Sequence, residues 1–259
     1  PLLVGSVQLA PQAGPWSFGN NLAGVELHDV GLRGTASAAG GIRWGTTSIT
    51  VLSIRNLMEN ISIFNFVATG APGLRINYMV TGRFNRLYTY NNGDGVQIFG
   101  GTTMQFNHLL SRVNARYGMT INNTSSSVTD LTIDEQSVIE SNQNEGLQVL
   151  TTNIANGQIS VRNTRFENNC VAAGAYQMTV APAAGAADTE VLVLDGVRFV
   201  TTNQTGDLSI DYVEKAKIAH TTFDSAGGKI PLKLASANAR GVVIDTCRTV
   251  GGTIDPDGR

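Results

Sequence analysis

The sequence predicts an all-β chain wound as a parallel β-helix, and three observations lead to this prediction. Triplets of an apolar, a polar and an apolar residue recur along the chain, usually just after a glycine. A second apolar alternation of period two follows each triplet, and no helical pattern separates the two. Charged residues make up only 15% of the chain, against about 25% in typical soluble domains, which disfavours a helical bundle.

The triplets place one short strand in each repeat. They follow one another at intervals of roughly 22 to 31 residues: Leu74-Arg75-Ile76, Val96-Gln97-Ile98, Met119-Thr120-Ile121, Leu147-Gln148-Val149, Met178-Thr179-Val180, Leu208-Ser209-Ile210 and Leu232-Lys233-Leu234. Strands this short cannot bury a core individually, but coils stacked about 4.8 Å apart can. Leucine-rich repeats need a spaced leucine consensus and propeller blades need about 40 to 50 residues, so neither fits.

A second strand lies between successive triplets. Its apolar pairs are Met104 and Phe106, Leu131 and Ile133, Ile159 and Val161, Leu192 and Leu194, Ala216 and Ile218, and Val242 and Ile244. Each repeat therefore carries at least two short strands separated by bends.

Asparagine-rich bends follow the second strand. A large apolar residue precedes polar residues that include Asn142 in one repeat and Asn168 with Asn169 in the next. Asparagine tolerates left-handed backbone geometry, and its amide can hydrogen-bond to the neighbouring coil. We therefore interpret this column of residues as structural.

Two segments resemble coils of the right-handed parallel β-helix superfamily: residues 91–98, Asn-Asn-Gly-Asp-Gly-Val-Gln-Ile, and residues 163–169, Asn-Thr-Arg-Phe-Glu-Asn-Asn. This pectate-lyase-like superfamily includes pectate lyases, polygalacturonases, other polysaccharide lyases and epimerases, and bacteriophage tailspikes. The resemblance implies a right-handed solenoid of about eight to ten coils, in line with the right-handed preference of parallel crossovers. We expect a non-repeat segment at 1–23 and a single β-helix domain at 24–259.

Motifs of the enzyme families in this superfamily are missing from the sequence. The chain has neither the clustered aspartates nor the Arg-x-Pro-x-x-Arg motif of pectate lyases, and Gly93-Asp94-Gly95 is not the Gly-Asp-Asp of polygalacturonases. The resemblance therefore implies a fold and a saccharide as the substrate class, but it carries over no catalytic residue. The three histidines show no metal-ligand spacing, and we expect neither a metal nor a cofactor.

One candidate catalytic pair consists of Glu140 and Glu167, which follow the large apolar residue in neighbouring repeats. One coil step is comparable to the separation of about 5 to 5.5 Å between the two carboxyls of retaining glycosidases. Acid and base chemistry on sugars is therefore one interpretation of this pair. The alternative is that acidic residues simply lie at solvated strand ends.

A second candidate catalytic cluster is Asp134 with Glu135. Asn107-His108 precedes it by one repeat, and Arg162-Asn163 follows it by one. An arginine beside carboxylates suits an acidic sugar, and a nearby His or Arg could act as the base in β-elimination. The alternative is a surface ladder of hydrogen bonds.

A candidate saccharide-binding patch lies in the repeats between residues 80 and 118. Tyrosine faces stack on sugar rings, and arginine forks grip carboxylates. Arg83 belongs to the same concentration of arginines and tyrosines, and the residues expected to bind the saccharide are Arg86, Tyr88, Tyr90, Arg112, Arg116 and Tyr117. The alternative is that tyrosines spaced by two residues belong partly to the core.

Longer connections at residues 122–130, 150–158 and 181–190 distinguish three successive repeats. Insertions at one turn position project on one side of a solenoid, so we expect them to wall a groove along its middle. The alternative is that they are tolerated surface insertions.

The charge balance narrows the classes of partner. The formal net charge is -2 and the pI is near 5.9, so there is no electrostatic footprint for nucleic acid or an anionic membrane. No apolar run approaches the roughly 20 residues that span a bilayer, so we expect no membrane insertion.

Three classes of function fit these observations. The leading hypothesis is a virion tailspike or tail-fibre-like β-helix that binds a cell-surface polysaccharide, with cleavage left open. It would act outside the cell or on the virion tail, as a homotrimer or as part of a larger chain or assembly. The missing enzyme motifs and the high Asn, Thr and Gly content favour it. The alternatives are a secreted polysaccharide lyase or glycoside hydrolase, and a purely structural β-helix protein.

Overall fold

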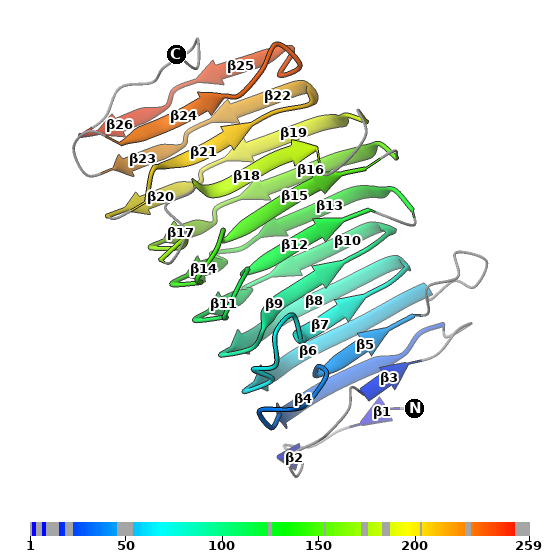
Figure 1. The fold of residues 1–259 in the computed structure, drawn as a ribbon. Coiled ribbons are helices and arrows are strands. Elements are labelled where there is room, and N and C mark those ends of the chain that lie inside the picture. The colour runs from blue at the N-terminus through cyan, green and yellow to red at the C-terminus, as the bar shows by residue number, and fades with distance from the viewer. Residues whose placement is uncertain are drawn as a thin grey trace.

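The coils of the chain stack along one axis, with the first described strands at one end and the last described strands at the other (Figure 1). The computed structural model describes residues 2–3, 7–8, 16–18, 23–45, 54–123, 126–152, 154–171, 176–182, 187–202, 204–225 and 229–251. Strands pair in parallel with the same strand one coil away, and no helix occurs among these residues. The coils wind in the right-handed sense, as the steric preference for parallel crossovers favours. The all-β parallel β-helix predicted from the sequence is therefore confirmed.

Each coil has three faces, and face 3 is a nine-stranded parallel sheet. Its strands are β3 (Trp16–Phe18), β5 (Ile42–Trp44), β7 (Pro72–Ile76), β9 (Asp94–Ile98), β12 (Met119–Asn122), β15 (Leu147–Thr151), β18 (Tyr176–Pro182), β21 (Gly206–Ile210) and β24 (Ile230–Leu234). The predicted triplets all lie in these strands, which confirms the repeat.

Faces 1 and 2 share a 17-stranded sheet, because three of its strands run across both faces. These three strands are β4 (Glu26–Arg33), β6 (Ile54–Phe64) and β8 (Met79–Tyr90). Face 1 holds their first halves together with β1 (Leu2–Leu3), β10 (Gly101–Asn107), β13 (Val128–Asp134), β16 (Asn156–Arg162), β19 (Thr189–Asp195), β22 (Val213–Ala219) and β25 (Val242–Asp245). Face 2 holds their second halves together with β2 (Val7–Gln8), β11 (Leu110–Arg112), β14 (Val138–Glu140), β17 (Arg165–Glu167), β20 (Arg198–Thr201), β23 (Thr222–Ser225) and β26 (Arg248–Val250).

The corner between faces 1 and 2 is turned by residues with left-handed backbone geometry. The long strands pass through it with φ of 52° at Asp29, 54° at Asn60 and 53° at Arg86. In the next coil His108, with φ of 51°, takes the same place between β10 and β11. Side-chain-bearing residues rarely adopt this conformation, so the register of the neighbouring coils holds the corner in shape.

Aromatic stacks run along the interior of the solenoid. Phe84 stacks on Phe106 with their ring centroids 4.3 Å apart. Phe199 lies between Phe166 at 5.1 Å and Phe223 at 5.4 Å. All five rings are fully buried, because period-two alternation turns the same position inward in every coil.

A buried asparagine ladder lies at the bend that follows face 2. Asn114 donates from its backbone N–H and from Nδ2 to Oδ1 of Asn142, at 3.0 and 2.8 Å. Asn142 repeats both bonds to Oδ1 of Asn169, at 3.3 and 2.7 Å. These three residues and Asn92 are completely buried. The structural role that the sequence predicted for this column is therefore confirmed.

The described parts of segment 1–23, expected to lie outside the repeat, contribute strands to both sheets. β1 and β2 pair with β4, and β3 pairs with β5. Stacking of coils therefore begins before residue 24. In the described part of the chain, no helix is long and apolar enough to cross a membrane.

Candidate functional site

Two adjoining hollows run along the outside of face 1, and together we call them the furrow. The first, of about 470 Å³, is lined by Glu26, Arg55, Asn56, Leu57, Thr81, Arg83 and Asn85. The second, of about 310 Å³, is lined by Thr81, Gly82, Arg83, Thr103, Met104, Gln105, Asp130, Thr132, Asp134 and Arg162. Because the two hollows share Thr81 and Arg83, the furrow is continuous from β4 to β16.

Two further hollows continue from the furrow over the corner to face 2. The corner hollow, of about 490 Å³, is lined by His108, Asp134, Glu135, Gln136 and Asn163. The outer hollow, of about 350 Å³, is lined by Gln136, Ser137, Val138, Asn163, Thr164, Arg165, Gly196 and Arg198. Asp134 lines both the furrow and the corner hollow, so the depression branches at this residue.

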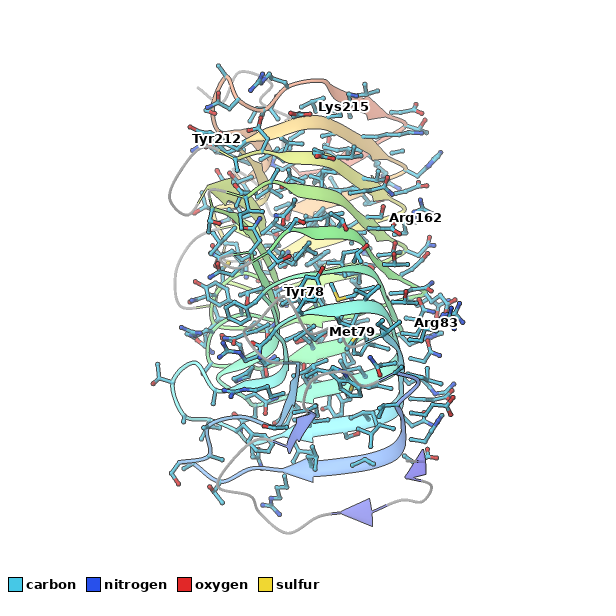
Figure 2. The ribbon with its side chains drawn as sticks, turned by 90° about the vertical axis from the view of Figure 1, so that its right-hand side faces the viewer. Tyr78, Met79, Arg83, Arg162, Tyr212 and Lys215 are labelled. Carbon is cyan, nitrogen blue, oxygen red and sulfur yellow. The ribbon has the colours of Figure 1, made fainter. Side chains whose placement is uncertain are left out.

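Strand alternation points the furrow side chains outward. In β8 the ring of Phe84 is buried, whereas the preceding Arg83 is exposed. In β16 the same holds for buried Val161 and exposed Arg162. Parallel pairing then stacks outward residues of successive coils into columns along the axis. Figure 2 shows Arg83 and Arg162 projecting from the same side of the solenoid.

Three charged groups in the furrow are free to meet a ligand. The side chains of Arg83, Asp130 and Arg162 form no ion pair or hydrogen bond with another described residue, although all three line one hollow. Each guanidinium therefore presents its five N–H donors, and the carboxylate its acceptor oxygens, to whatever occupies the furrow. Arginine forks suit carboxylate and other planar anionic groups.

Asp134 and Glu135, one of the predicted catalytic clusters, lie where the furrow meets the corner hollow. Asp134 Oδ1 accepts hydrogen bonds from the Glu135 backbone N–H at 2.7 Å and from Asn163 Nδ2 at 3.0 Å. Asn107 pairs with Asp134 in the register, and His108 Nδ1 lies 3.3 Å from Glu135 Oε2. The predicted grouping of these residues is confirmed, and their catalytic role stays a prediction.

Glu140 and Glu167, the other predicted catalytic pair, are register neighbours on face 2. Arg112 Nε lies 3.3 Å from Glu140 Oε1, and an Arg165 terminal nitrogen lies 3.9 Å from Glu140 Oε2. The same guanidinium of Arg165 contacts Glu167. The adjacency predicted from the sequence is confirmed, but both carboxylates belong to a ladder of ion pairs. Their catalytic role stays a prediction.

The predicted saccharide-binding patch divides into two groups, the first on face 2 and its corner. Tyr88 and Tyr90 have ring centroids 6.1 Å apart, and the Arg112 guanidinium lies 6.0 Å from the Tyr90 ring. Arg86 lies at the corner and is 2.7 Å from Glu59. Both tyrosines are half-buried on the outer side, so they do not belong to the core.

The second group, Arg116 and Tyr117, lies beside face 3. Arg116 donates from Nε and a terminal nitrogen to the two oxygens of the buried Asp94, at 2.9 and 2.5 Å. This hydrogen bonding to Asp94 raises the pKa of Arg116. The guanidinium carbon lies 5.6 Å from the Tyr117 ring. Arg116 therefore closes over a buried carboxylate, and the six residues do not form one surface.

Arg55 and Asp130 were missed by reasoning from the sequence. Both occupy a column of positive φ on face 1, with 55° at Arg55 and 57° at Asp130. Glycine is the usual sequence signal for positive φ, and these positions carry other residues. The composition of a single sequence therefore does not indicate this column. The available signal was spacing, because Asp130 directly precedes the apolar alternation of Leu131 and Ile133.

The longer connections join face 3 to face 1 in three successive coils, between β12 and β13, β15 and β16, and β18 and β19. Of these segments, Asp130 and Gln158 lie on β13 and β16, and Asp130 borders the furrow. Residues 124–125, 153 and 183–186 of these connections lie outside the described residues. Among the described residues, no group of three or more His, Cys, Asp or Glu side chains could hold a metal ion.

Glu145 is a half-buried carboxyl between β12 and β18 on the outer side of face 3. Burial raises its pKa, and hydrogen bonds from its own backbone and from the Thr179 side chain offset part of this shift. Because the folded-state pKa lies above the unfolded value of about 4.3, the folded chain binds the proton more tightly. Stability therefore falls as pH rises from the unfolded pKa through the folded pKa.

Glu145→Gln removes this titration, so the variant should gain stability relative to the parent protein between pH 4 and pH 7. Urea unfolding at the two pH values measures the difference. Glu190→Gln serves as the control for the substitution itself, because Glu190 is exposed. An equal effect of Glu145→Gln at both pH values would show that burial does not govern this carboxyl.

Comparisons with known proteins add a likeness in fold. No family model matches the sequence, and no curated protein matches it. Among solved structures, the A-module of the mannuronan C-5 epimerase AlgE4 from Azotobacter vinelandii aligns with a TM-score of 0.47 at 12% identity. The alignment covers 92% of this chain and 80% of that chain. A likeness this distant says nothing about which residues act in either protein.

Proposed function

We propose that this chain is the saccharide-binding β-helix of a virion tailspike or tail fibre, and that a cell-surface polysaccharide lies along the furrow on face 1. The observation that carries the proposal is the continuity of the furrow across the strands from β4 to β16. Five coil steps separate these strands, and at about 4.8 Å a step the furrow is about 24 Å long. A depression of this length suits several units of a polymer rather than one small molecule.

The lining of the furrow supports a hydroxyl-rich ligand with anionic groups. Thr81, Gln105 and Thr132 offer hydroxyl and amide groups for hydrogen bonds. Arg83 and Arg162 add two guanidinium groups that form no ion pair with a described residue, although Asp130 and Asp134 line the same hollow. They stand three coil steps apart, about 14 Å along the axis. An acidic polysaccharide meets both requirements, because its carboxylates can be held by arginine forks at intervals.

Loss of either free arginine should weaken binding. Arg83→Ala and Arg162→Ala should each raise the dissociation constant about tenfold or more, because a hydrogen bond to a charged group contributes about 1.5 to 3 kcal/mol. Binding is measured by interferometry on an array of purified bacterial capsular polysaccharides. Arg248→Ala, an exposed arginine on face 2, is the matched control and should leave binding unchanged. Equal affinities for all four proteins would remove the furrow from consideration.

The spike role has its own test in the mass of the assembly. Phage tailspikes usually form homotrimers, so for a spike light scattering coupled to size exclusion should give three times 27.4 kDa. A monomer would favour the secreted enzyme instead. Unsaturated or reducing-end products released from a bound polysaccharide would show cleavage, and Asp134 is the first residue to substitute, because it is the predicted catalytic carboxyl that lines the furrow.

A further inference from the structure

The coil that contains β13 and β14 has one residue more at the corner than its neighbours. Asn107 pairs with Asp134 before the corner, and Leu110 pairs with Val138 after it. The corner of the preceding coil, between β10 and β11, therefore consists of two residues, 108–109. The corner between β13 and β14 consists of three residues, 135–137. The coil after it places 163–164 there, between β16 and β17. The extra residue is thus local to one coil.

The extra residue bulges outward. Glu135 and Gln136 both adopt positive φ, 54° and 59°, whereas each neighbouring corner has one such residue, His108 or Asn163. Ser137 is completely buried and donates to the Asp134 carbonyl at 2.6 Å, which ties the base of the bulge to the coil. Gln136 is exposed and, together with Asn163, lines both the corner hollow and the outer hollow, so these two residues lie at the boundary between them.

The corner hollow opens from the side of the furrow. Asp134 lines both, and its carboxylate is held in place by Glu135 and Asn163. A polymer that follows the furrow along the axis therefore passes the mouth of the corner hollow at Asp134. At about 490 Å³ the corner hollow lies within the range of about 300 to 1,000 Å³ for small-ligand pockets, so one sugar unit fits.

We infer that the polysaccharide carries a side branch and that the branch sugar occupies the corner hollow. The inference rests on the proposed function, and it names a substrate class that the furrow alone does not. His108, Glu135 and Asn163 supply a ring nitrogen, a carboxylate and an amide, which are hydrogen-bond partners for sugar hydroxyls. The corner of the preceding coil, with His108 and Leu109, lacks the extra residue, so we assign the branch position to the coil that contains Gln136.

The test compares one ligand with and without its branch. A capsular polysaccharide that the protein binds on the array, with one monosaccharide branch per repeat, is debranched by the matching exoglycosidase. The parent protein should bind the intact polymer about tenfold more tightly than the debranched one, the equivalent of one charged hydrogen bond. Deletion of Gln136, which restores the shorter corner of the neighbouring coils, should lower affinity for the intact polymer to that for the debranched one.

A second variant tests the inference if the protein that lacks Gln136 does not fold. His108→Ala removes an exposed side chain whose contact with Glu135 is at the surface, so the fold should be retained. It should reduce the preference for the branched polymer. His220→Ala is the matched control, because His220 pairs with Asp195 at the same corner outside the corner hollow. The preference of His220→Ala for the branched over the debranched polymer should equal that of the parent protein.

The outcomes separate the two proposals. Equal affinity of the parent protein for intact and debranched polymer, or binding of unbranched polymers alone, overturns the branch while the furrow stands. A preference for the branch that survives both His108→Ala and deletion of Gln136 places the branch elsewhere and overturns the corner site. Binding to no polysaccharide on the array overturns the proposed function and the branch with it.

Discussion

Phe199→Ala should lower the free energy of unfolding by about 3 to 5 kcal/mol, the range for removing a fully buried aromatic ring from a core. Phe199 is the middle ring of a stack, with Phe166 and Phe223 at 5.1 and 5.4 Å. Its removal leaves a cavity between two coils, and neither flanking ring can close it without leaving its own coil. Urea unfolding measures the loss through the midpoint and slope of the transition.

Phe64→Ala is the matched control for this prediction. Phe64 is an aromatic residue on the outer side of face 2 and is half-buried. Its truncation should cost about 1 kcal/mol or less, in line with substitutions away from the core. Equal losses for Phe64 and Phe199 would mean that the inward and outward positions of this face have been exchanged.

Asn142→Ala should cost about 2 to 6 kcal/mol, because it leaves two buried donors without an acceptor, at about 1 to 3 kcal/mol each. The donors are the backbone N–H and Nδ2 of Asn114, both bound to Oδ1 of Asn142. The substitution also removes the Nδ2 donors to Asn169 and to the Ser111 carbonyl. No water reaches these atoms to replace the bonds, since all the ladder residues are completely buried.

Asn144→Ala tests whether the effect belongs to the ladder. Asn144 lies two residues further on and is half-buried, and its side chain makes no hydrogen bond to another described residue. Its truncation should fall within about 0.5 kcal/mol of the parent. Hydrogen exchange adds a second measurement, because the amide of Asn114 should lose protection in Asn142→Ala. Retained protection there would contradict the assigned hydrogen bond.

The fold could be predicted from the sequence because its signals are local and repeated. Leu74-Arg75-Ile76 alone says little, but the same triplet in each repeat fixes one strand per coil. The neighbours of Asp134 and of Glu167 also follow from counting along the repeats, and the register bears this out. In a parallel solenoid, a fixed place in the repeat becomes a fixed place in space.

The furrow could not be predicted in the same way. Arg83 and Arg162 lie in one hollow because strand alternation turns both side chains outward on face 1. Their places also depend on the column of positive-φ residues and on the pairing of β8 with β10, β10 with β13 and β13 with β16. The extra residue at Gln136 lengthens the apolar spacing from five residues, as between Val161 and Phe166, to six between Ile133 and Ile139, but this spacing does not say what the corner borders. Arg116 shows the same limit, because its bond to Asp94 depends on packing beside face 3 that no spacing reveals. Whether two charged side chains pair depends on the direction in which each side chain points. The sequence repeats indicate only where the backbone lies.

Strand pairing in the described sheets links each coil only to the coils directly before and after it. Such a column unfolds piecewise, since an opened coil weakens its immediate neighbours and no others. A polymer laid in the furrow contacts coils that have no direct bond to one another. A bound polymer therefore links coils that do not pair with one another. The coils from β4 to β16 should unfold together when the polymer is bound and separately when it is absent. Occupancy of the furrow would thus change the cooperativity of the whole solenoid as well as its stability.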